Sequence, residues 1–304
     1  MDNLSSLSTP RAIPQPLSQR TSRQRRRQKA IARGLRMLLG YAVLCLFGII
    51  FLIPFLWSIS SSLKTENEIF IFPPVWMPKL PLWSNYPEAL DYMHFGLLLR
   101  NTLFIAVLST VGNVLSAAFV AYGFSRFRFK GRSVLFSALL STMMLPYQVT
   151  MIPLFLMFQR LGWLNTYYPL IVPAFFAHPF FVFLLRQFFL TLPRELEDAA
   201  RVDGCNPLQI WWRIIVPLAY PALATVTVFS FLGSWNEFIG PLIYLTDQKI
   251  YTLSLGLSVF KSSYTTQWGY LMAASVTMTL PPLLIFFATQ RYFVQGIALT
   301  GIKG

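Results

Sequence analysis

Six long apolar segments, separated by short charged or proline-rich stretches, dominate the hydrophobic pattern of this chain of 304 residues. A helix needs roughly 18–20 apolar residues to cross the hydrocarbon core of a bilayer, and each segment reaches that length. The segments lack the strict alternation over about ten residues that is typical of transmembrane β-strands. The pattern therefore predicts an all-α polytopic membrane protein with six transmembrane helices, over residues 38–59, 101–124, 133–157, 164–185, 218–241 and 270–290.

The composition agrees with this prediction. Charged residues make up 12% of the chain, against roughly 25% in a soluble domain. The two cysteines lie in different settings, Cys45 in the first apolar segment and Cys205 in a charged one, so no disulfide is expected. The net charge of +14 fits either a nucleic-acid-binding protein or a membrane protein whose cytoplasmic loops collect Lys and Arg.

The distribution of the charges decides between these two explanations. Nineteen of the 25 Lys and Arg residues fall in segments that six crossings would place on one side: 1–36, 125–132, 186–213 and the C-terminal end. Cytoplasmic loops of membrane proteins show this bias. The sequence therefore predicts a multi-pass protein of the cell (inner) membrane with both termini in the cytoplasm, and it gives no support for a nucleic-acid partner.

The basic arm, residues 1–36, precedes a predicted six-helix transmembrane domain over residues 37–304. The arm is rich in Arg, Ser and Gln and contains one acid, Asp2. We interpret it as a disordered cytoplasmic tail that fixes orientation and contacts anionic membrane lipid. A transit peptide and a nucleic-acid-binding arm have a similar composition and remain alternatives.

Residues 60–96 form the longest segment predicted on the outer side of the membrane. They are dense in proline and tryptophan, as in Phe72-Pro73-Pro74 and Pro81-Leu82-Trp83. This proline density excludes a long helix but allows a structured loop. The aromatic residues indicate either an interfacial aromatic belt or a docking surface for an outside partner.

Residues 193–217 interrupt the apolar pattern with charges, glycine and proline. Pro193 suits the first turn of a helix. Gly204 is suited to the left-handed residue that ends it, and Asn206-Pro207 reads as a cap followed by a second helix. Acidic residues, which favour a helix N-terminus, occupy the first turn: Glu195, Glu197 and Asp198.

The first of these two short helices carries a small apolar face made of Leu196, Ala199 and Ala200. Small side chains there would let another protein approach the backbone closely, and the acids with Arg201 would form a polar rim. We interpret the segment as a coupling element that a soluble ATPase grips. An amphipathic loop resting on lipid is the alternative.

A resemblance supports the first interpretation. Permease subunits of bacterial ABC importers, the inner-membrane components of binding-protein-dependent transport systems, carry the cytoplasmic signature Glu-Ala-Ala, three residues, Gly, nine residues, Ile, one residue, Leu-Pro. This chain has Asp198-Ala199-Ala200, Gly204, Ile214 and Val216-Pro217 at the same spacing. Asp198 in place of Glu and Val216 in place of Leu are its two departures.

The likeness covers about residues 37–304 and points to the carbohydrate-uptake branch, in particular to the six-span maltose-type partner permease. The phrases that carry it are, in chain order, Leu63-Lys64-Thr65, Glu68-Ile69-Phe70, Phe72-Pro73-Pro74, Arg126-Phe127-Arg128-Phe129-Lys130-Gly131-Arg132, Met143-Met144-Leu145-Pro146, Leu185-Arg186-Gln187-Phe188-Phe189, Trp235-Asn236-Glu237-Phe238 and Gln290-Arg291-Tyr292-Phe293-Val294.

The resemblance implies a type I ABC importer permease fold and four kinds of partner: a second permease subunit in a heterodimer, ABC ATPase subunits, an extracytoplasmic solute-binding protein, and a sugar or sugar-like substrate. ATP and Mg would bind to the ATPase subunits, and this chain would bind no cofactor. The residues expected to couple to the ATPase are Glu195, Leu196, Glu197, Asp198, Ala199, Ala200, Arg201, Asp203, Gly204, Asn206, Pro207, Ile214 and Pro217.

The chain lacks the sequence signatures of an enzyme. It has no Gly-x-x-x-x-Gly-Lys-Ser/Thr phosphate loop, no Gly-x-Ser-x-Gly nucleophile motif and no metal-ligand spacing around its two histidines. We therefore expect a non-catalytic transport subunit with no metal site. A standalone secondary transporter of a small polar solute remains the alternative, although its apolar segments contain few ionisable residues; a membrane enzyme finds no support.

Glu237 is the one acid inside or at the rim of an apolar segment, and such residues are candidates for function. It lies about 20 residues, or roughly 30 Å of helix, beyond Pro217, which places it near the outer side. The structural alternative is that Glu237 only forms a hydrogen bond between helices near the membrane interface. The candidates for the substrate path are Tyr147, Gln148, His178, Trp235, Asn236 and Glu237, with His178-Pro179 more typical of a packing kink.

Overall fold

The computed structural model describes residues 19–261 and 266–301, and the side chains of 33–261 and 266–290. These residues form helices, with one isolated β-bridge between Lys261 and Thr266, so the all-α prediction is confirmed for them. The helices are α1 (Gln19–Ser62), α2 (Glu66–Ile69), α3 (Asn85–Tyr92), α4 (Phe95–Arg126), α5 (Arg132–Ser141), η1 (Thr142–Met144), α6 (Tyr147–Arg160), α7 (Tyr168–Ile171), η2 (Val172–Phe176), α8 (Pro179–Thr191), α9 (Glu195–Val202), α10 (Pro207–Ile210), η3 (Trp211–Ile215), α11 (Val216–Leu218), α12 (Tyr220–Asn236), α13 (Ile239–Tyr244), η4 (Gln248–Ile250), α14 (Leu253–Gly256), η5 (Leu257–Phe260) and α15 (Trp268–Gly301).

Residues up to Trp57 form one structural unit and residues from Ser58 onward form another. The first unit consists, where it is described, of α1, which joins the basic arm to the first apolar segment in one continuous helix. The arm is therefore helical from Gln19 on, where the sequence favoured disorder; residues 1–18 lie outside the described part. Gln, Arg, Lys and Ala are good helix formers, and extending an existing helix avoids the cost of nucleation.

Four helical stretches among the described residues are long and apolar enough to cross a membrane, and two bent helix pairs raise the number to six if each pair is one span. The six correspond to the six apolar segments of the sequence. The four stretches are Arg33–Ser62, Phe95–Arg126, Tyr168–Thr191 and Trp268–Gln290. The bent pairs are Arg132–Met144 with Tyr147–Arg160, and Pro207–Leu218 with Tyr220–Asn236.

The third apolar segment differs from the single helix that its length predicted. Its chain direction turns by 98° between η1 and α6. Leu145 and Pro146 are extended there, with ψ of 116° and 140°. Proline disfavours the helical conformation of the residue before it and offers no N–H to continue the helix, so Pro146 separates the two halves.

The core of the second unit is built around α4, which packs against α8 and α12, while α12 packs against α15. Small residues line the buried side of α4, among them Ala106, Gly112, Ala117 and Ala121. Small side chains let helix backbones approach closely in membrane proteins. One buried cluster, with Val182 and Phe189, lies towards α9 and α10, and a second contains Trp235 and Phe260.

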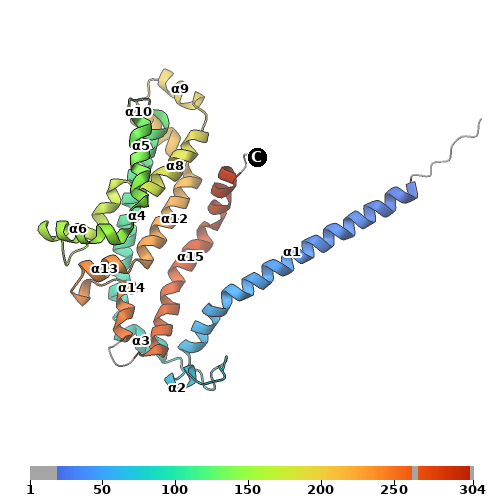
Figure 1. The fold of residues 1–304 in the computed structure, drawn as a ribbon, viewed down its shortest axis with the longest axis vertical. Coiled ribbons are helices and arrows are strands. Elements are labelled where there is room, and N and C mark those ends of the chain that lie inside the picture. Colours follow the sequence, from blue (N-terminus) through green and yellow to red (C-terminus); the bar gives the residue numbers. More distant parts are fainter. Residues whose placement is uncertain (1–18, 262–265, 302–304) are drawn as a thin grey trace, which may run out of the picture. The chain divides into compact units, whose positions relative to one another are not determined.

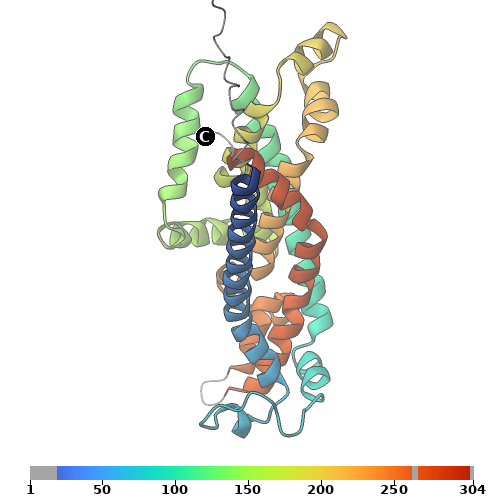
Figure 2. The same cartoon turned by 90° about the vertical axis from the view of Figure 1, so that its right-hand side faces the viewer.

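The two ends of this bundle carry different elements. Helices α9 and α10 lie at one end, here called the α9 end, and α2 and α3 lie at the other, the α3 end (Figures 1 and 2). The segment predicted on the outer side, 60–96, contributes to the α3 end, and its longest complete helix is α3, with eight residues. The prediction that proline prevents a long helix in this segment is thus confirmed.

Candidate functional site

Helix α9 ends in the way that the sequence predicted. Gly204 has a φ of +82°, in the left-handed region where residues with a Cβ are strained. This conformation lets the Gly204 N–H donate to the Arg201 carbonyl at 3.0 Å and the Cys205 N–H donate to the Ala200 carbonyl at 2.9 Å. These two bonds form a Schellman motif, which satisfies the last carbonyls of the helix. The helix begins at Glu195, two residues after Pro193.

The second helix begins at the predicted cap. The Asn206 side chain accepts from the Gln209 N–H, and the Gln209 side chain accepts from the Asn206 N–H, which makes a capping box before Pro207. Helix α10 continues through the π-helical turn η3 and α11 to Leu218. Ile210, Trp211 and Ile215 are buried in the cluster that also contains Phe189, so this second element is fixed to the bundle.

The buried face of α9 differs from the predicted apolar face. Its buried residues are Glu197 and Ala200, whereas Leu196 is 43% exposed and Ala199 is exposed too. Hydrophobic spacing favoured Leu196, Ala199 and Ala200 as one packed face. In the tertiary structure the helix is instead oriented so that the Glu197 side chain points inward, where it meets a basic side chain of another helix.

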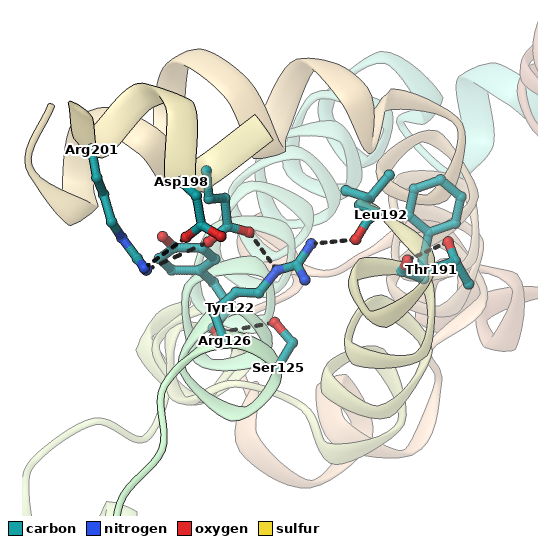
Figure 3. Close-up of polar contacts among 9 residues, drawn as sticks. Tyr122, Ser125, Arg126, Thr191, Leu192, Asp198 and Arg201 are labelled. Atoms are coloured by element: carbon teal, nitrogen blue, oxygen red, sulfur yellow. Dashed lines mark hydrogen bonds and ion pairs between the residues drawn. The ribbon is translucent and has the colours of Figure 1, made fainter. Parts of the chain in front are cut away.

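That partner is Arg126, the last residue of α4. Its Nε lies 2.6 Å from Glu197 Oε1, and the two side chains are 2% and 4% exposed. The N–H does not point along this line, so the contact is a close ion pair rather than a well-aligned hydrogen bond. Arg126 Nη2 also donates to the Leu192 carbonyl at 3.1 Å, just after α8 (Figure 3).

A second, exposed arginine lies on the other side of the cluster. Arg201 Nη1 donates to Asp198 Oδ1 at 3.2 Å, and its Nη2 lies 3.9 Å from Glu197 Oε2. Asp198 is 67% exposed at its side chain, in contrast to its neighbour Glu197 (Figure 3). Arg126 was not among the predicted residues of this site, because its only signal in the sequence was a basic residue at the end of a distant apolar segment.

The surface that remains accessible at the α9 end mixes large apolar and charged side chains. Val202 is 88% exposed, and Leu196, Leu208 and Trp212 are exposed as well. Aromatic and aliphatic side chains surrounded by charges are typical of protein interfaces. The other exposed residues of the predicted set are Glu195, Asp198, Ala199, Arg201, Asp203, Gly204, Asn206, Pro207 and Pro217, whereas Ile214 is half-buried.

The six candidates for the substrate path do not form one cluster. Trp235 has no exposed surface and stacks on Phe231 with ring centroids 5.6 Å apart, so it belongs to the core. His178 is exposed at the start of α8, where its ring lies 5.0 Å from that of Phe181. The helix breaks at this point, as the His178-Pro179 pair predicted.

The structure does bring two of the candidates to a common neighbour, Tyr244. Tyr147 and Glu237 both lie close enough to Tyr244 to act electrostatically on its hydroxyl. Glu237 Oε1 also accepts the Gly240 N–H at 2.8 Å, near the start of α13. Gln148 and Asn236 are exposed, and Asn236 bonds to the Leu232 carbonyl of its own helix. Glu237 thus has a structural role as a helix cap.

At the α3 end the structure contains a cavity of about 1230 Å³, between the start of α4 and residues 246–261. Basic side chains line it, namely Arg100, Lys249 and Lys261, together with Asp247 and three tyrosines. Asn101 of α4 ties residues 249–251 to α4 at the edge of this cavity. Its side-chain amide donates to the Lys249 and Tyr251 carbonyls at 2.8 and 3.0 Å.

Residues 60–96 are held at this end by a buried lysine. The Lys64 side chain is 1% exposed, and its amine donates to the Val75 carbonyl. Burial lowers the pKa of Lys64, while the nearby Glu68 acts in the opposite direction. Phe72, Met77 and Trp83 remain largely exposed, which fits both an aromatic belt and a docking surface.

Residues 113–299 match the family model described as the inner membrane component of binding-protein-dependent transport systems. The chain belongs to this family. The arabinooligosaccharides transport system permease protein AraQ of Bacillus subtilis is 34% identical, over 85% of this chain and 93% of AraQ. The lactose transport system permease protein LacG of Rhizobium radiobacter is 33% identical, over 88% of this chain and 97% of LacG.

A solved structure agrees with the family assignment. A chain of a bacterial ABC transporter involved in the import of the acidic polysaccharide alginate superposes with a TM-score of 0.75 at 25% identity, over 86% of this permease and 98% of that chain. The permease therefore has the type I ABC importer fold, in which Asp198-Ala199-Ala200 lie in α9 and Gly204 lies in the turn between α9 and α10.

Proposed function

We propose that this permease is the subunit of an ATP-driven sugar importer that forms the translocation path together with a second, different permease. The observation that carries the proposal is the α9 end: two capped short helices present an exposed surface of Val202, Leu208 and Trp212 beside charged residues. A connecting loop needs no such surface. The sugar class rests on relatives whose names specify arabinooligosaccharides and lactose.

The ATPase subunits bind at the α9 end, on the cytoplasmic side that the Lys and Arg distribution predicts. ATP binding brings the two ATPase subunits together and displaces α9 and α10. The displacement closes the path towards the cytoplasm and opens it outward. Energy passes to the permease only if α9 binds the ATPase more tightly in one of these two states than in the other. ATP and Mg bind to the ATPase, and the permease itself performs no catalysis.

A solute-binding protein docks at the α3 end, on the outer side of the membrane. The cavity lined by Arg100, Lys249 and Lys261 supports this assignment, because it offers positive charge to an acidic surface. The exposed aromatic residues of 60–96 provide apolar contact area beside it. Asn101 fixes the wall of the cavity through two backbone carbonyls, so the docking surface is preformed.

The path for the sugar runs between the two permeases. Tyr147, Gln148, His178, Asn236 and Glu237 are exposed in the single chain, as residues facing a partner-lined path must be. Tyrosine, glutamine and asparagine can hydrogen-bond to sugar hydroxyls. Trp235 supports this wall from inside the core, where it stacks on Phe231.

Reconstitution into lipid vesicles tests the proposal. Vesicles receive either this permease alone or the complete assembly, identified by co-purification, and uptake of radiolabelled lactose and arabinobiose is measured. We expect accumulation only with the complete assembly, the binding protein and ATP on the ATPase side. Uphill accumulation by the permease alone on an ion gradient would instead establish the secondary transporter and overturn the proposal.

A further inference from the structure

Glu197 and Asp198 are neighbours in the coupling helix but face opposite ways. Asp198 is 67% exposed at its side chain and pairs with the exposed Arg201. Glu197 is 4% exposed at its side chain and contacts Arg126, so a docking protein cannot reach its carboxylate while the pair persists. The two acids therefore have different roles, and that of Glu197 lies within this chain.

Arg126 joins three elements at one point. It is the last residue of α4, its Nε contacts Glu197 of α9, and its Nη2 donates to the Leu192 carbonyl at the end of α8. Apart from Glu197, the buried residue that α9 contributes is Ala200, whose side chain is a single methyl group. A helix of eight residues with so little apolar contact is not held in one orientation by packing alone.

A buried ion pair is suited to fixing an orientation. Removing two charges from water is costly, so such a pair adds little net stability compared with apolar side chains of similar size. An arrangement that separates the partners, however, leaves a buried charge unpaired and is strongly disfavoured. The pair therefore selects one orientation of α9 relative to α4 and α8.

We propose that Arg126 and Glu197 are positioning residues that lock α9 to the ends of α4 and α8, so that displacement of α9 by the ATPase moves both membrane helices with it. This inference rests on the proposed function. Without the lock, the ATPase would still dock on the exposed face of α9, but α9 would rotate or slide on the bundle instead of moving it. ATP hydrolysis and sugar movement would then be uncoupled.

The test compares four variants of the permease in the complete assembly in vesicles. Glu197→Gln and Arg126→Gln each remove one charge. The double variant Arg126→Met with Glu197→Met removes both and refills the site with apolar groups of similar length, so it leaves no unpaired charge to destabilise the fold. Arg128→Gln is the matched control, because Arg128 is an exposed arginine two residues further on.

Three quantities are measured: ATPase subunits that co-purify, ATP hydrolysed, and sugar moved per ATP hydrolysed. We expect the three pair variants to retain the ATPase and its hydrolysis, while sugar moved per ATP falls about tenfold, a typical size for coupling between sites. Arg128→Gln should match the wild type. The double variant is decisive, because a pair that served stability alone would be replaced by methionines without loss of transport.

Normal sugar transport per ATP in the double variant would overturn the inference and leave the proposed function intact. Failure of the wild-type permease to co-purify with an ATPase would contradict the proposed function itself, so the two failures are distinguishable. Arg126→Lys adds a graded measurement: it keeps the charge beside Glu197 but loses the fork that reaches Leu192, and should retain more transport than Arg126→Gln.

Discussion

Asn206 and Gln209 bind each other's backbone at the start of α10. Asn206 Oδ1 accepts the Gln209 N–H at 2.8 Å, and Gln209 Oε1 accepts the Asn206 N–H at 2.8 Å. The reciprocal bonds satisfy two backbone donors that the helix cannot use, and they fix the residue at which α10 begins. The turn at Gly204 and the start of α10 are therefore set by adjacent local motifs.

Asn206→Ala should weaken ATPase binding, because loss of an N-cap side chain costs about 1 kcal/mol of helix stability and loosens the start of α10. Asn206→Asp should behave as the wild type, since aspartate caps helices equally well. The amount of ATPase that co-purifies with each variant measures the difference. Equal recovery with Ala and Asp would show that the capping box does not support docking.

Gly204→Val should strongly reduce ATP-driven uptake, whereas Gly204→Asn should reduce it less. A Cβ at Gly204 meets no atom within 4 Å, so the penalty comes from the φ of +82° alone. Left-handed backbone costs roughly 1–2 kcal/mol for most residues and less for asparagine. Uptake in vesicles, normalised to the inserted permease, gives the ranking. Full activity of the valine variant would rule out a requirement for this turn.

Glu237→Ala should lower uptake or the stimulation of ATP hydrolysis by the binding protein, while Glu237→Gln should stay near the wild type. The reason is the bond from the Gly240 N–H to Glu237 Oε1, which glutamine preserves and alanine removes at a cost of about 1 kcal/mol. Both activities are measured on the reconstituted assembly. An equal loss in the two variants would contradict the capping role and assign the effect to the carboxylate charge.

Gly112→Ala should destabilise the permease, and Gly123→Ala on the same helix should not. A Cβ at Gly112 would lie 2.7 Å from Phe175 Cδ2, whereas a Cβ at Gly123 meets no atom within 4 Å. Overpacking of this kind costs about 1–3 kcal/mol. Thermal unfolding of each variant in detergent measures the effect. A melting temperature for Gly112→Ala equal to that of Gly123→Ala would show that Phe175 moves aside freely.

The sequence by itself determined the features that depend on neighbouring residues. The apolar segments specified where the long helical stretches lie because each must fill the thickness of a bilayer on its own, although Pro146 divides the third segment into two helices. Gly204 and Asn206-Pro207 specified where α9 ends and α10 begins, since caps use groups within five residues of one another. The break at His178-Pro179 was predictable for the same reason. Family membership followed from the spacing of Asp198, Gly204 and Ile214.

The tertiary structure alone decided which side of each element faces inward. The sequence pattern favoured Leu196 for the buried face of α9, yet Glu197 is the residue that is buried. The reason is that the fold places Arg126 next to Glu197, and a charge can be buried when it is paired with an opposite charge. Trp235 is in the core rather than on a path because Phe231 and its neighbours enclose it. Such contacts join residues far apart in the chain, so no local pattern encodes them.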